Sequence, residues 1–188
     1  MVRISGGQFC GRKLQVPESG VRPTKELVRQ ALFSVLGETI EGKRVADLFA
    51  GSGVIGLEAL SRGAAEAAWI ENDDQVFGIL KQNVSSIYGV KRTSACMRVD
   101  GLAWLKSELG PKEFDLIVGD PPYKPPGDQP WVEMLLESMT DSSRLKPEGL
   151  FVMEQRSKYP VIDNPRWTRL KDTKSGDTRL VYYRRIIP

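Results

Sequence analysis

The sequence predicts an α/β fold built on a mostly parallel β-sheet, and three observations support this prediction. From Lys43 onward, short apolar runs of strand-like composition alternate with amphipathic stretches, as they do in βαβ units. A glycine-rich turn, "GSGVIG" at residues 51–56, directly follows the first of these runs. Near the C-terminus, two strand-like runs are separated by little more than "KSGD", which indicates an antiparallel hairpin that closes the sheet.

The first 42 residues differ from the rest and predict an N-terminal extension. Short extended pieces interrupted by glycines, "VRISGGQFCGRKLQVP" at 2–17, indicate a small β-hairpin. The stretch "PTKELVRQALFSVL" at 23–36 follows as a helix, and one face of it holds Val28, Leu32, Val35 and Leu36. We therefore divide the chain into an extension, residues 1–42, and a main domain, residues 43–188.

The main domain contains five expected parallel strands, four expected helices and the C-terminal hairpin. The strands are residues 44–50, 67–71, 95–100, 114–120 and 149–155. The helices are residues 55–62, 75–87, 101–109 and 131–139. In the second helix, one stripe at helical spacing holds Val76, Ile79, Leu80, Asn83, Val84 and Ile87. The hairpin strands are residues 166–172 and 178–186.

Length and composition are those of one globular domain with an ordinary core. The 188 residues are 40% apolar and 27% charged, which is typical of globular proteins. No apolar run approaches the ~20 residues that span a bilayer, and the N-terminus lacks the apolar segment of a signal peptide. We expect a monomeric, cytoplasmic protein with no membrane partner.

The absence of histidine restricts the chemistry that the chain can perform. It excludes Ser-His-Asp triads, Cys-His pairs and histidine-ligated metals together. Cys10 and Cys96 are far apart in the sequence, and neither belongs to a CxxC pair. We therefore expect unpaired thiols and no metal site.

Charge is distributed unevenly along the chain. Residues 1–44 carry a net charge of +4, residues 45–155 carry −7, and residues 156–188 carry +6. Basic ends that flank an acidic middle indicate a polyanionic partner at the two ends. The alternative is that these ends are solvated faces that happen to be basic.

The acidic residue before the glycine turn bears on which ligand the turn binds. In the nicotinamide fingerprint, the helix after the glycines faces a pyrophosphate, and an acid lies ~20 residues further on. Asp47 would there face negative phosphates or lie buried without a partner. S-Adenosylmethionine has a cationic amino-acid end and no phosphate, so it suits this position better. Glu71 and Asp100 end the next two strands and would accept hydrogen bonds from the ribose and the adenine.

These carboxylates have a second interpretation, because an acid after a strand often caps the following helix. Asp100 could serve only as the cap of helix 101–109. Asp73 or Asp74 could cap helix 75–87, which would leave Glu71 available to a ligand.

The fourth strand ends in "DPPY", residues 120–123, and this motif suits a target amine. Two prolines stiffen the turn and give no N–H, so the turn offers two acceptors, the Asp120 carboxylate and the Pro121 carbonyl. These acceptors suit the two hydrogens of an NH₂ group, and Tyr123 supplies a face on which a base stacks. Holding both hydrogens favours a pyramidal nitrogen whose lone pair meets a methyl group in line, without metal or imidazole. The expected catalytic residues are Asp120, Pro121, Pro122 and Tyr123.

Several stretches, taken in order, resemble the RsmD family of class I S-adenosylmethionine-dependent methyltransferases. They are "RISGGQFCGRKLQVP", "RPTKELVRQALFSVL", "VADLFAGSGVIGLEALSRGA", "IENDDQV", "LKQNV" and "FDLIVGDPPY". These bacterial enzymes methylate N2 of a guanine in 16S ribosomal RNA. The resemblance implies a Rossmann-like fold, with a mostly parallel seven-stranded sheet, helices on both faces, and the hairpin and helix as an N-terminal extension. It also implies free 16S rRNA or an assembling small ribosomal subunit as the partner.

The resemblance assigns roles to particular residues. Arg22, Pro23 and Thr24 would border the cofactor pocket, and Arg3, Arg12 and Lys13 would face RNA. The residues expected to bind S-adenosylmethionine are Arg22, Thr24, Asp47, Phe49, Ala50, Gly51, Ser52, Gly53, Glu71, Asn72, Asp100, Gly101 and Asp120.

Three alternatives remain open at the level of sequence. An amine held by "DPPY" does not identify its ring, so N6 methylation of adenine in DNA or RNA is the nearest one. An NAD(P)-dependent oxidoreductase would use "GSGVIG" for pyrophosphate, against the charge of Asp47. A catalytically inactive RNA-binding module is the third.

Overall fold

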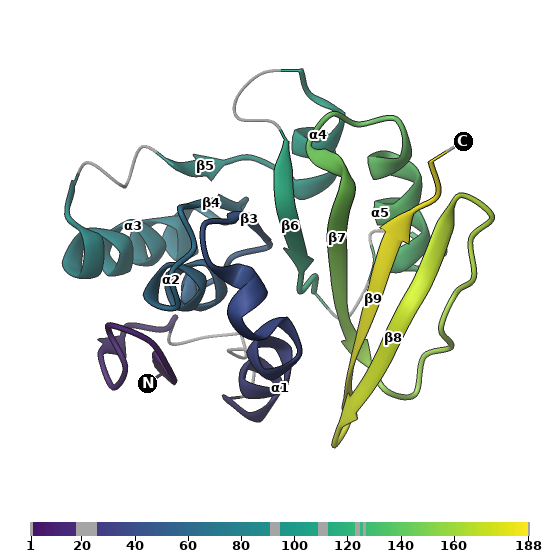
Figure 1. Cartoon of the computed structure of the whole chain (residues 1–188). Coiled ribbons are helices and arrows are strands. Elements are labelled where there is room, and N and C mark those ends of the chain that lie inside the picture. The colour runs from purple at the N-terminus through teal and green to yellow at the C-terminus, as the bar shows by residue number, and fades with distance from the viewer. Residues whose placement is uncertain are drawn as a thin grey trace.

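The main sheet of the computed structural model has seven strands in the order β5-β4-β3-β6-β7-β9-β8 (Figure 1). The structure describes residues 2–17, 26–90, 95–108, 113–122, 125 and 127–187. The strands are β3 Arg44–Leu48, β4 Glu66–Glu71, β5 Cys96–Arg98, β6 Phe114–Gly119, β7 Leu145–Arg156, β8 Trp167–Ser175 and β9 Thr178–Arg185. Neighbours among β3 to β7 pair in parallel, and β9 pairs antiparallel with both β7 and β8. The predicted parallel sheet and its closing hairpin are confirmed.

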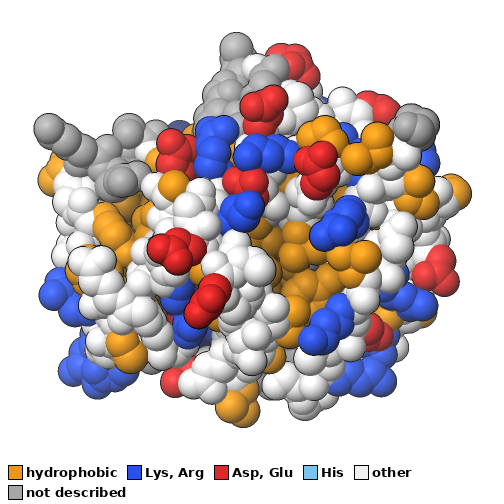
Figure 2. Space-filling model, in the orientation of Figure 1, with side chains coloured by type: hydrophobic (Ala, Val, Ile, Leu, Met, Phe, Trp, Pro, Cys, Tyr) orange, Lys and Arg blue, Asp and Glu red, His pale blue; other side chains and the backbone are white. Residues whose placement is uncertain are grey.

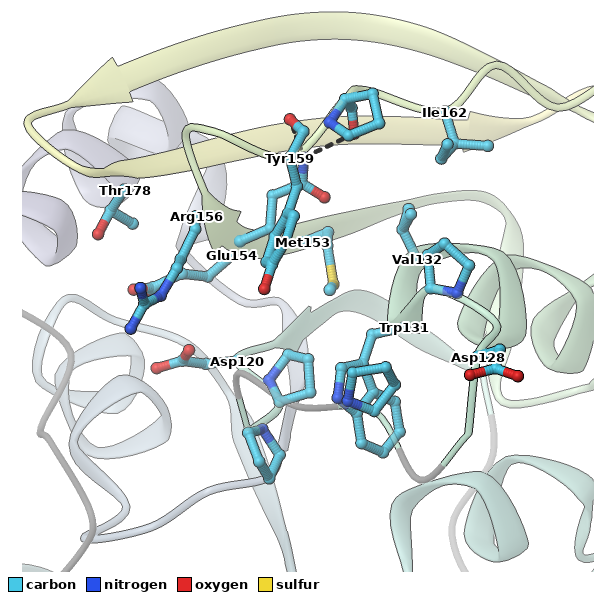
Figure 3. A pocket seen from close by; sticks show the side chains of 16 residues that line it. Asp120, Asp128, Trp131, Val132, Met153, Glu154, Arg156, Tyr159, Ile162 and Thr178 are labelled. Atoms are coloured by element: carbon cyan, nitrogen blue, oxygen red, sulfur yellow. Dashed lines mark hydrogen bonds between the residues drawn. The ribbon is translucent and has the colours of Figure 1, made fainter.

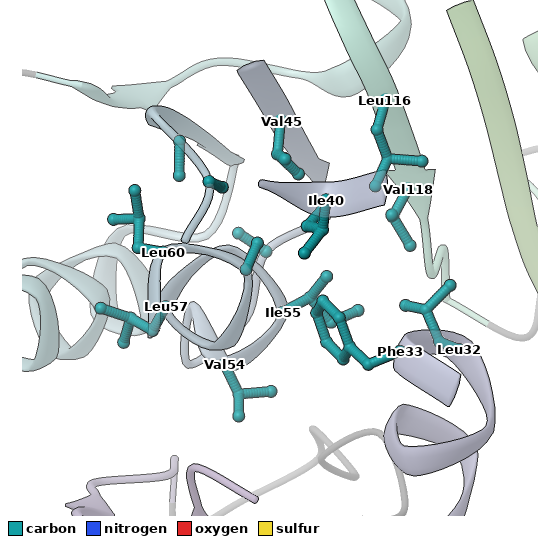
Figure 4. Close-up of a cluster of buried hydrophobic side chains, with 14 of the residues drawn as sticks. Leu32, Phe33, Ile40, Val45, Val54, Ile55, Leu57, Leu60, Leu116 and Val118 are labelled. Carbon is teal, nitrogen blue, oxygen red and sulfur yellow. The ribbon is translucent and has the colours of Figure 1, made fainter. Parts of the chain in front are cut away.

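Helices cover both faces of this sheet, as the family resemblance implies. They are α1 Glu26–Leu36, the 3₁₀ helix η1 Gly37–Ile40, α2 Val54–Ser61, α3 Asp74–Tyr88, α4 Gly101–Lys106 and α5 Trp131–Thr140. Apolar residues of β6 alternate between the two faces because successive side chains of a strand point in opposite directions. Leu116 and Val118 pack with α1, α2 and α3, whereas Ile117 packs with α4 and α5. Figure 4 shows Leu32 and Phe33 of α1 beside Ile55 of α2 in the first of these cores.

The element boundaries differ from the expected ones in ways that the backbone explains. Strand β3 ends at Leu48 rather than at residue 50, because Phe49 adopts a positive φ of 62° and leaves the strand direction. Helix α4 ends at Lys106, and residue 109, the expected end, lies outside the described residues. Strand β7 begins at Leu145, four residues before the expected start, and pairs there with Phe114 of β6.

The N-terminal extension forms the predicted hairpin and helix. Strands β1 Val2–Arg3 and β2 Lys13–Leu14 pair antiparallel, apart from the main sheet. Helix α1 begins at Glu26 within the described residues and packs its apolar face into the first core. The extension therefore shares its hydrophobic core with the main domain.

A buried carboxylate anchors this extension to α2. Glu58 is fully buried and contacts Arg29 of α1 at 3.3 Å and Arg62 at 2.9 Å. It also accepts hydrogen bonds from the amide and the hydroxyl of Ser5, at the start of the hairpin loop. The amide of Gln8 donates to the carbonyl of Ser61 at 2.7 Å. Because a buried charge is costly unless paired, this cluster holds the extension in one position.

Both cysteines are unpaired, as predicted. Cys10 is exposed, whereas burial raises the pKa of the Cys96 thiol to about 11 against a weaker opposing effect of Lys81. The Cys96 thiol therefore stays protonated at neutral pH. Across the ranges given above, no helix is long and apolar enough to cross a bilayer.

Candidate functional site

The glycine turn lies between β3 and α2, where the sheet changes its order of strands. Strands β3, β4 and β5 follow one another outward, and the chain then returns to place β6 on the other side of β3. Such a switch point leaves a crevice at the carboxyl ends of the strands. Gly51 and Gly53 have positive φ values of 54° and 80°, a conformation that glycine adopts without strain. The glycines are therefore explained by the backbone conformation of the turn, and by themselves they do not identify a ligand.

The third glycine of "GSGVIG" serves packing. A Cβ atom on Gly56 would lie 2.3 Å from the indole nitrogen of Trp69, in the fully buried interior of β4. Helix α2 approaches β4 this closely only because residue 56 has no side chain. The glycine fingerprint thus reflects close helix–sheet packing, and the ligand has to be inferred from the neighbouring side chains.

Asp47 is a buried carboxylate directed at this turn. Its side chain is 1% exposed and accepts a hydrogen bond from the amide of Gly56 at 3.0 Å. Burial raises its pKa well above the ordinary value, the Gly56 bond lowers it, and the charges of Asp120 and Glu71 raise it further. Three carboxylates therefore share one region, and a cation placed among them would be stabilised.

Glu71 holds the glycine turn in place. Its two carboxylate oxygens accept from the amide of Gly51 and from the amide of Asp73, each at 2.9 Å. Asp73 in turn accepts from the amide of Val76 and caps α3, which confirms the cap predicted for Asp73 or Asp74. Glu71 thus links the turn to the start of α3.

Asp100 caps α4, which is the second of its two sequence interpretations. Its carboxylate accepts from the amide of Ala103 at 2.9 Å. The side chain is nevertheless exposed at the rim of the sheet, and a part in ligand binding stays a prediction.

A cleft of about 1040 Å³ runs along this rim, which is the size of a small-molecule site. The expected residues that line it are Asp47, Phe49, Ala50, Gly51, Ser52, Glu71, Asn72, Asp100, Gly101, Asp120, Pro121 and Pro122. Gly53 belongs to the same turn. Arg22, Pro23, Thr24 and Tyr123 lie outside the described residues. Val16 and Pro17 of the extension also line the cleft.

The double-proline corner, Pro121 and Pro122, forms part of the lining of this cleft. Leu48 of β3 pairs with Gly119 of β6, and the amide of Asp120 donates to the Leu48 carbonyl at 3.3 Å. Asp120 therefore leaves the sheet beside Phe49, at the switch point. Phe49 contacts Trp131 of α5 edge to face, with ring centroids 5.1 Å apart.

A second cavity of about 210 Å³ lies on the other side of this corner (Figure 3). Its apolar wall includes Trp131, Val132, Met153, Tyr159, Pro160 and Ile162. Four polar side chains line both this cavity and the cleft: Asp120, Glu154, Arg156 and Thr178. Figure 3 shows the guanidinium of Arg156 extending toward the Asp120 carboxylate. The two spaces therefore meet at one polar junction beside the two prolines.

Sequence reasoning missed three members of this junction, Glu154, Arg156 and Thr178. Glu154 stands near the carboxyl end of an expected strand, as do the other acids of the rim, so the same argument could have found it. Arg156 and Thr178 gave no comparable signal, because they reach the site only through the pairing of β7 with β9.

The residues expected to face RNA lie on the N-terminal hairpin, away from both cavities. Arg3 donates to the carbonyl of Gly11 at 3.0 Å, and Arg12 donates to the carbonyl of Ser86 at 3.2 Å. Lys13 is exposed. In Figure 2, Lys and Arg side chains gather at the two lower corners of the face, where the N-terminal hairpin and the β8–β9 hairpin lie in Figure 1, with acidic side chains between them.

Comparison with known proteins identifies the family. The family described as "Conserved hypothetical protein 95", which comprises the RsmD proteins, matches residues 2–184. The chain belongs to the RsmD family. RsmD relatives named "Ribosomal RNA small subunit methyltransferase D" are 34% identical in Haemophilus influenzae and 32% identical in Escherichia coli K12. The alignments cover 97% and 98% of this chain and 92% and 90% of those relatives. As a member of the RsmD family, this chain is a methyltransferase.

Solved structures give the same result for the RsmD fold. The Escherichia coli protein yhhF, named as a methyltransferase, superposes with a TM-score of 0.80 at 30% identity, over 98% of this chain and 97% of its own. The Haemophilus influenzae protein HI0767, named as a methylase, gives 0.79 at 30% identity over 99% of both chains. An RNA methyltransferase from Salinibacter ruber, solved with S-adenosyl-L-homocysteine, is 17% identical with a TM-score of 0.61 and shares the fold. The class I methyltransferase fold predicted from the sequence is confirmed.

Proposed function

We propose that this chain transfers a methyl group from S-adenosylmethionine to the exocyclic N2 amine of a guanine in 16S rRNA of the small ribosomal subunit. The observation that carries the proposal is the junction at Asp120, where the glycine-turn cleft meets the double-proline corner. A donor lying in the cleft and a base entering from the corner would meet at this carboxylate. The relatives named as small-subunit rRNA methyltransferases support the choice of RNA.

The residues of the cleft fit S-adenosylmethionine better than a dinucleotide. Asp47 is buried with a raised pKa, and Asp120 and Glu71 add negative charge to its surroundings. A pyrophosphate would add negative charge to this group of carboxylates and increase their electrostatic repulsion. The ammonium and the sulfonium of S-adenosylmethionine would reduce that repulsion. Asp47 and the turn would hold the amino-acid end, and Glu71, Asn72, Asp100 and Gly101 would border the nucleoside. When bound, the cofactor supplies an electrophilic methyl group.

The corner residues would position the attacking amine. The Asp120 carboxylate and the Pro121 carbonyl would each accept one hydrogen of the NH₂ group, which turns the nitrogen lone pair toward the cleft. Pro121 and Pro122 limit the movement of the turn because their rings fix φ. Trp131, and by expectation Tyr123, would offer aromatic faces to the base. The rate would then come from position and electrostatics.

Binding of RNA would involve the basic ends of the chain. Arg3, Arg12 and Lys13 of the extension, residues 1–42, would neutralise phosphates without reading bases. A target base has to leave its stack to reach a corner of this kind. A loop of rRNA, free or in an assembling particle, is therefore the expected substrate.

The test is transfer of tritium from labelled S-adenosylmethionine to three substrates: naked 16S rRNA, small-subunit particles from a deletion strain, and duplex DNA. After digestion to nucleosides, N2-methylguanosine is expected from one of the ribosomal substrates. N6-methyladenosine as the sole product would overturn the guanine assignment. Calorimetric titration with S-adenosylhomocysteine and with NADH completes the test, and tight binding of NADH alone would favour the oxidoreductase.

The Asp120→Ala variant separates catalysis from RNA binding. Transfer should be lost, while affinity for RNA changes little, because the phosphate contacts lie elsewhere. Asp141→Ala is the matched control, since this carboxylate is exposed and pairs at the surface with Arg166. Full activity of Asp120→Ala would contradict the proposed mechanism and favour another arrangement of the amine.

A further inference from the structure

We infer that the carboxylate of Glu154 reads the N1–H group of the target base and so selects guanine over adenine. This inference rests on the proposed function, because it assumes that a purine amine enters the corner at Asp120. It goes beyond that function by naming the residue that decides between the two purines.

The sheet places Glu154 beside Asp120. Gly119, the last residue of β6, pairs in parallel with Met153 of β7, and the residues that follow these two along the chain are Asp120 and Glu154. Parallel neighbouring strands lie about 4.8 Å apart, so two carboxylates leave the sheet from adjacent positions at one rim. Both line the cleft and the second cavity. The register of β6 on β7 therefore builds a pair of acceptors.

Glu154 is positioned to face a ligand rather than bulk solvent. It is 9% exposed in the middle of the strand order, because β7 lies between β6 and β9. Its backbone position pairs with Leu180 of β9, which fixes it in the sheet. Figure 3 shows it on the wall of the cavity together with Arg156 and Met153. The carboxylate is therefore an acceptor that is largely shielded from solvent at the wall of both spaces.

The Watson–Crick edge of guanine matches two neighbouring acceptors. Guanine presents N1–H next to its N2 amine, so two adjacent groups donate hydrogen bonds. Adenine presents its N6 amine next to N1, which carries a lone pair and no hydrogen. With an amine held at Asp120, guanine would donate from N1 to Glu154, whereas adenine would place a lone pair against that carboxylate. A site built to accept a hydrogen bond rejects the analogue that lacks the donor.

The remaining walls suit the rest of a purine. Trp131, Met153 and Tyr159 offer apolar surface to the faces of a flat ring. Arg156 and Thr178 carry donors at the same junction, and guanine has one further acceptor on this edge, O6. The donors and acceptors of the junction therefore complement guanine in kind.

The experiment compares two bases that both carry a 2-amine. Guanine has N1–H, whereas 2,6-diaminopurine has an unprotonated N1 in the same place. A synthetic RNA segment with either base at the methylated position is ligated into 16S rRNA and assembled into particles. The wild-type protein and the Glu154→Gln variant are then assayed for kcat/KM on each particle. Glutamine keeps the size of the side chain and adds an N–H₂ donor.

The variant should reverse the preference. The wild-type protein should methylate guanine at least about 100-fold faster than diaminopurine. Glu154→Gln should lower kcat/KM on guanine by about 10- to 100-fold, the effect of losing one charge-assisted hydrogen bond, and raise it on diaminopurine. Affinity for S-adenosylhomocysteine should not change. The matched control is Glu148→Gln, the same substitution at an exposed position of the same strand, which should behave as wild type on both bases.

The outcomes separate this inference from the proposed function. If the wild-type protein makes N2-methylguanosine and Glu154→Gln behaves like it on both bases, the inference is wrong and the function stands. A folded Glu154→Gln protein that is inactive on both bases, with its melting temperature unchanged, also overturns the inference, because base selection alone would not remove activity on diaminopurine. If the wild-type protein makes no N2-methylguanosine from any substrate, the proposed function itself fails.

Discussion

The indole nitrogen of Trp69 donates a hydrogen bond to the carbonyl oxygen of Gly53, and the two atoms are 3.1 Å apart. Trp69 is fully buried in β4, so this bond ties the glycine turn to the interior of the sheet. The same indole occupies the space in which a side chain at residue 56 would lie. One tryptophan therefore determines both the position of the turn and the approach of α2.

We predict opposite effects for two glycine-to-alanine substitutions in helices. Gly56→Ala should lower the free energy of unfolding by about 1–3 kcal/mol, because the new methyl group overlaps the Trp69 ring. Gly78→Ala, in the exposed part of α3 with open space around it, should raise it by about 0.4–1 kcal/mol. Denaturant unfolding of both variants measures the difference. A stabilised Gly56→Ala protein would show that α2 moves easily away from β4.

Asp47→Asn should weaken cofactor binding without destabilising the protein. Asparagine keeps an acceptor for the amide of Gly56 but loses the charge that would face a cationic ligand. Affinity for S-adenosylmethionine should fall about tenfold or more. Binding of adenosine, which lacks the amino-acid end, serves as the control and should change little. Equal losses of affinity for S-adenosylmethionine and adenosine would show that Asp47 does not interact with the cationic amino-acid end.

The pKa of Asp47 predicts how stability depends on pH. Because burial raises this pKa in the folded state, folding favours the protonated form of Asp47. Its contribution is therefore most favourable below the unfolded pKa, near 4, and is lost as the pH rises through the folded value. Asp47→Asn should remove this loss, so the variant should equal or exceed the wild-type melting temperature at pH 7. A bound cation should reverse the pKa shift, and affinity should rise with pH over the same range in the wild-type protein alone.

Glu71→Ala should loosen the glycine turn. The substitution leaves the amides of Gly51 and Asp73 without their acceptor. We expect the free energy of unfolding to fall by about 1–3 kcal/mol and the affinity for S-adenosylhomocysteine to fall with it. Glu71→Gln keeps one good acceptor, so its stability and its affinity should lie between those of the wild-type protein and those of Glu71→Ala. Calorimetry and thermal melts on the wild-type protein and both variants measure the affinity and the stability. An unchanged affinity in Glu71→Ala would show that Glu71 does not contribute to cofactor binding.

Glu58→Gln should destabilise the protein far more than a comparable surface change. The substitution removes the negative charge of Glu58 from beside buried Arg29, and the loss of one member of a buried ion pair costs about 3–5 kcal/mol in other proteins. Glu66→Gln removes an exposed pair with Arg44 and should change stability by about 0–1 kcal/mol. Chemical denaturation measures the loss of stability in each variant. Similar losses in both would show that the cluster at Glu58 contributes little to holding the extension in place.

Lys13→Ala should reduce the salt dependence of RNA binding. If Lys13 neutralises one phosphate, the slope of log K against log salt should fall by about 0.7–0.9. Lys43→Ala is the control, because Lys43 is also exposed but lies beside Asp115 in the main domain. Affinity for S-adenosylhomocysteine should be the same in both variants. An unchanged slope for Lys13→Ala would show that Lys13 does not neutralise a phosphate and would contradict an RNA-binding surface on the hairpin.

The periodicity of apolar residues was sufficient to predict the alternation of strands and helices and the mostly parallel sheet. Asp47, Glu71 and Asp120 stand at or near the carboxyl ends of expected strands, so these rim acids could be predicted from their positions along the chain. Glu154 stands near the carboxyl end of an expected strand and could have been found by the same argument. Arg156 and Thr178 were missed because they belong to the site only through strand register, which local sequence does not encode. The domain boundary at residues 42 and 43 stays a prediction, since both parts share one core.

The contact between the N-terminal hairpin and α2 also constrains the order of folding during translation. Residues 5 to 9 bond to residues 58 to 61, more than 50 positions later in the chain. The hairpin loop therefore lacks these bonding partners until α2 has been synthesised, and contacts of such long range form slowly. A nascent chain stalled before residue 58 would therefore carry a hairpin without its contacts to α2.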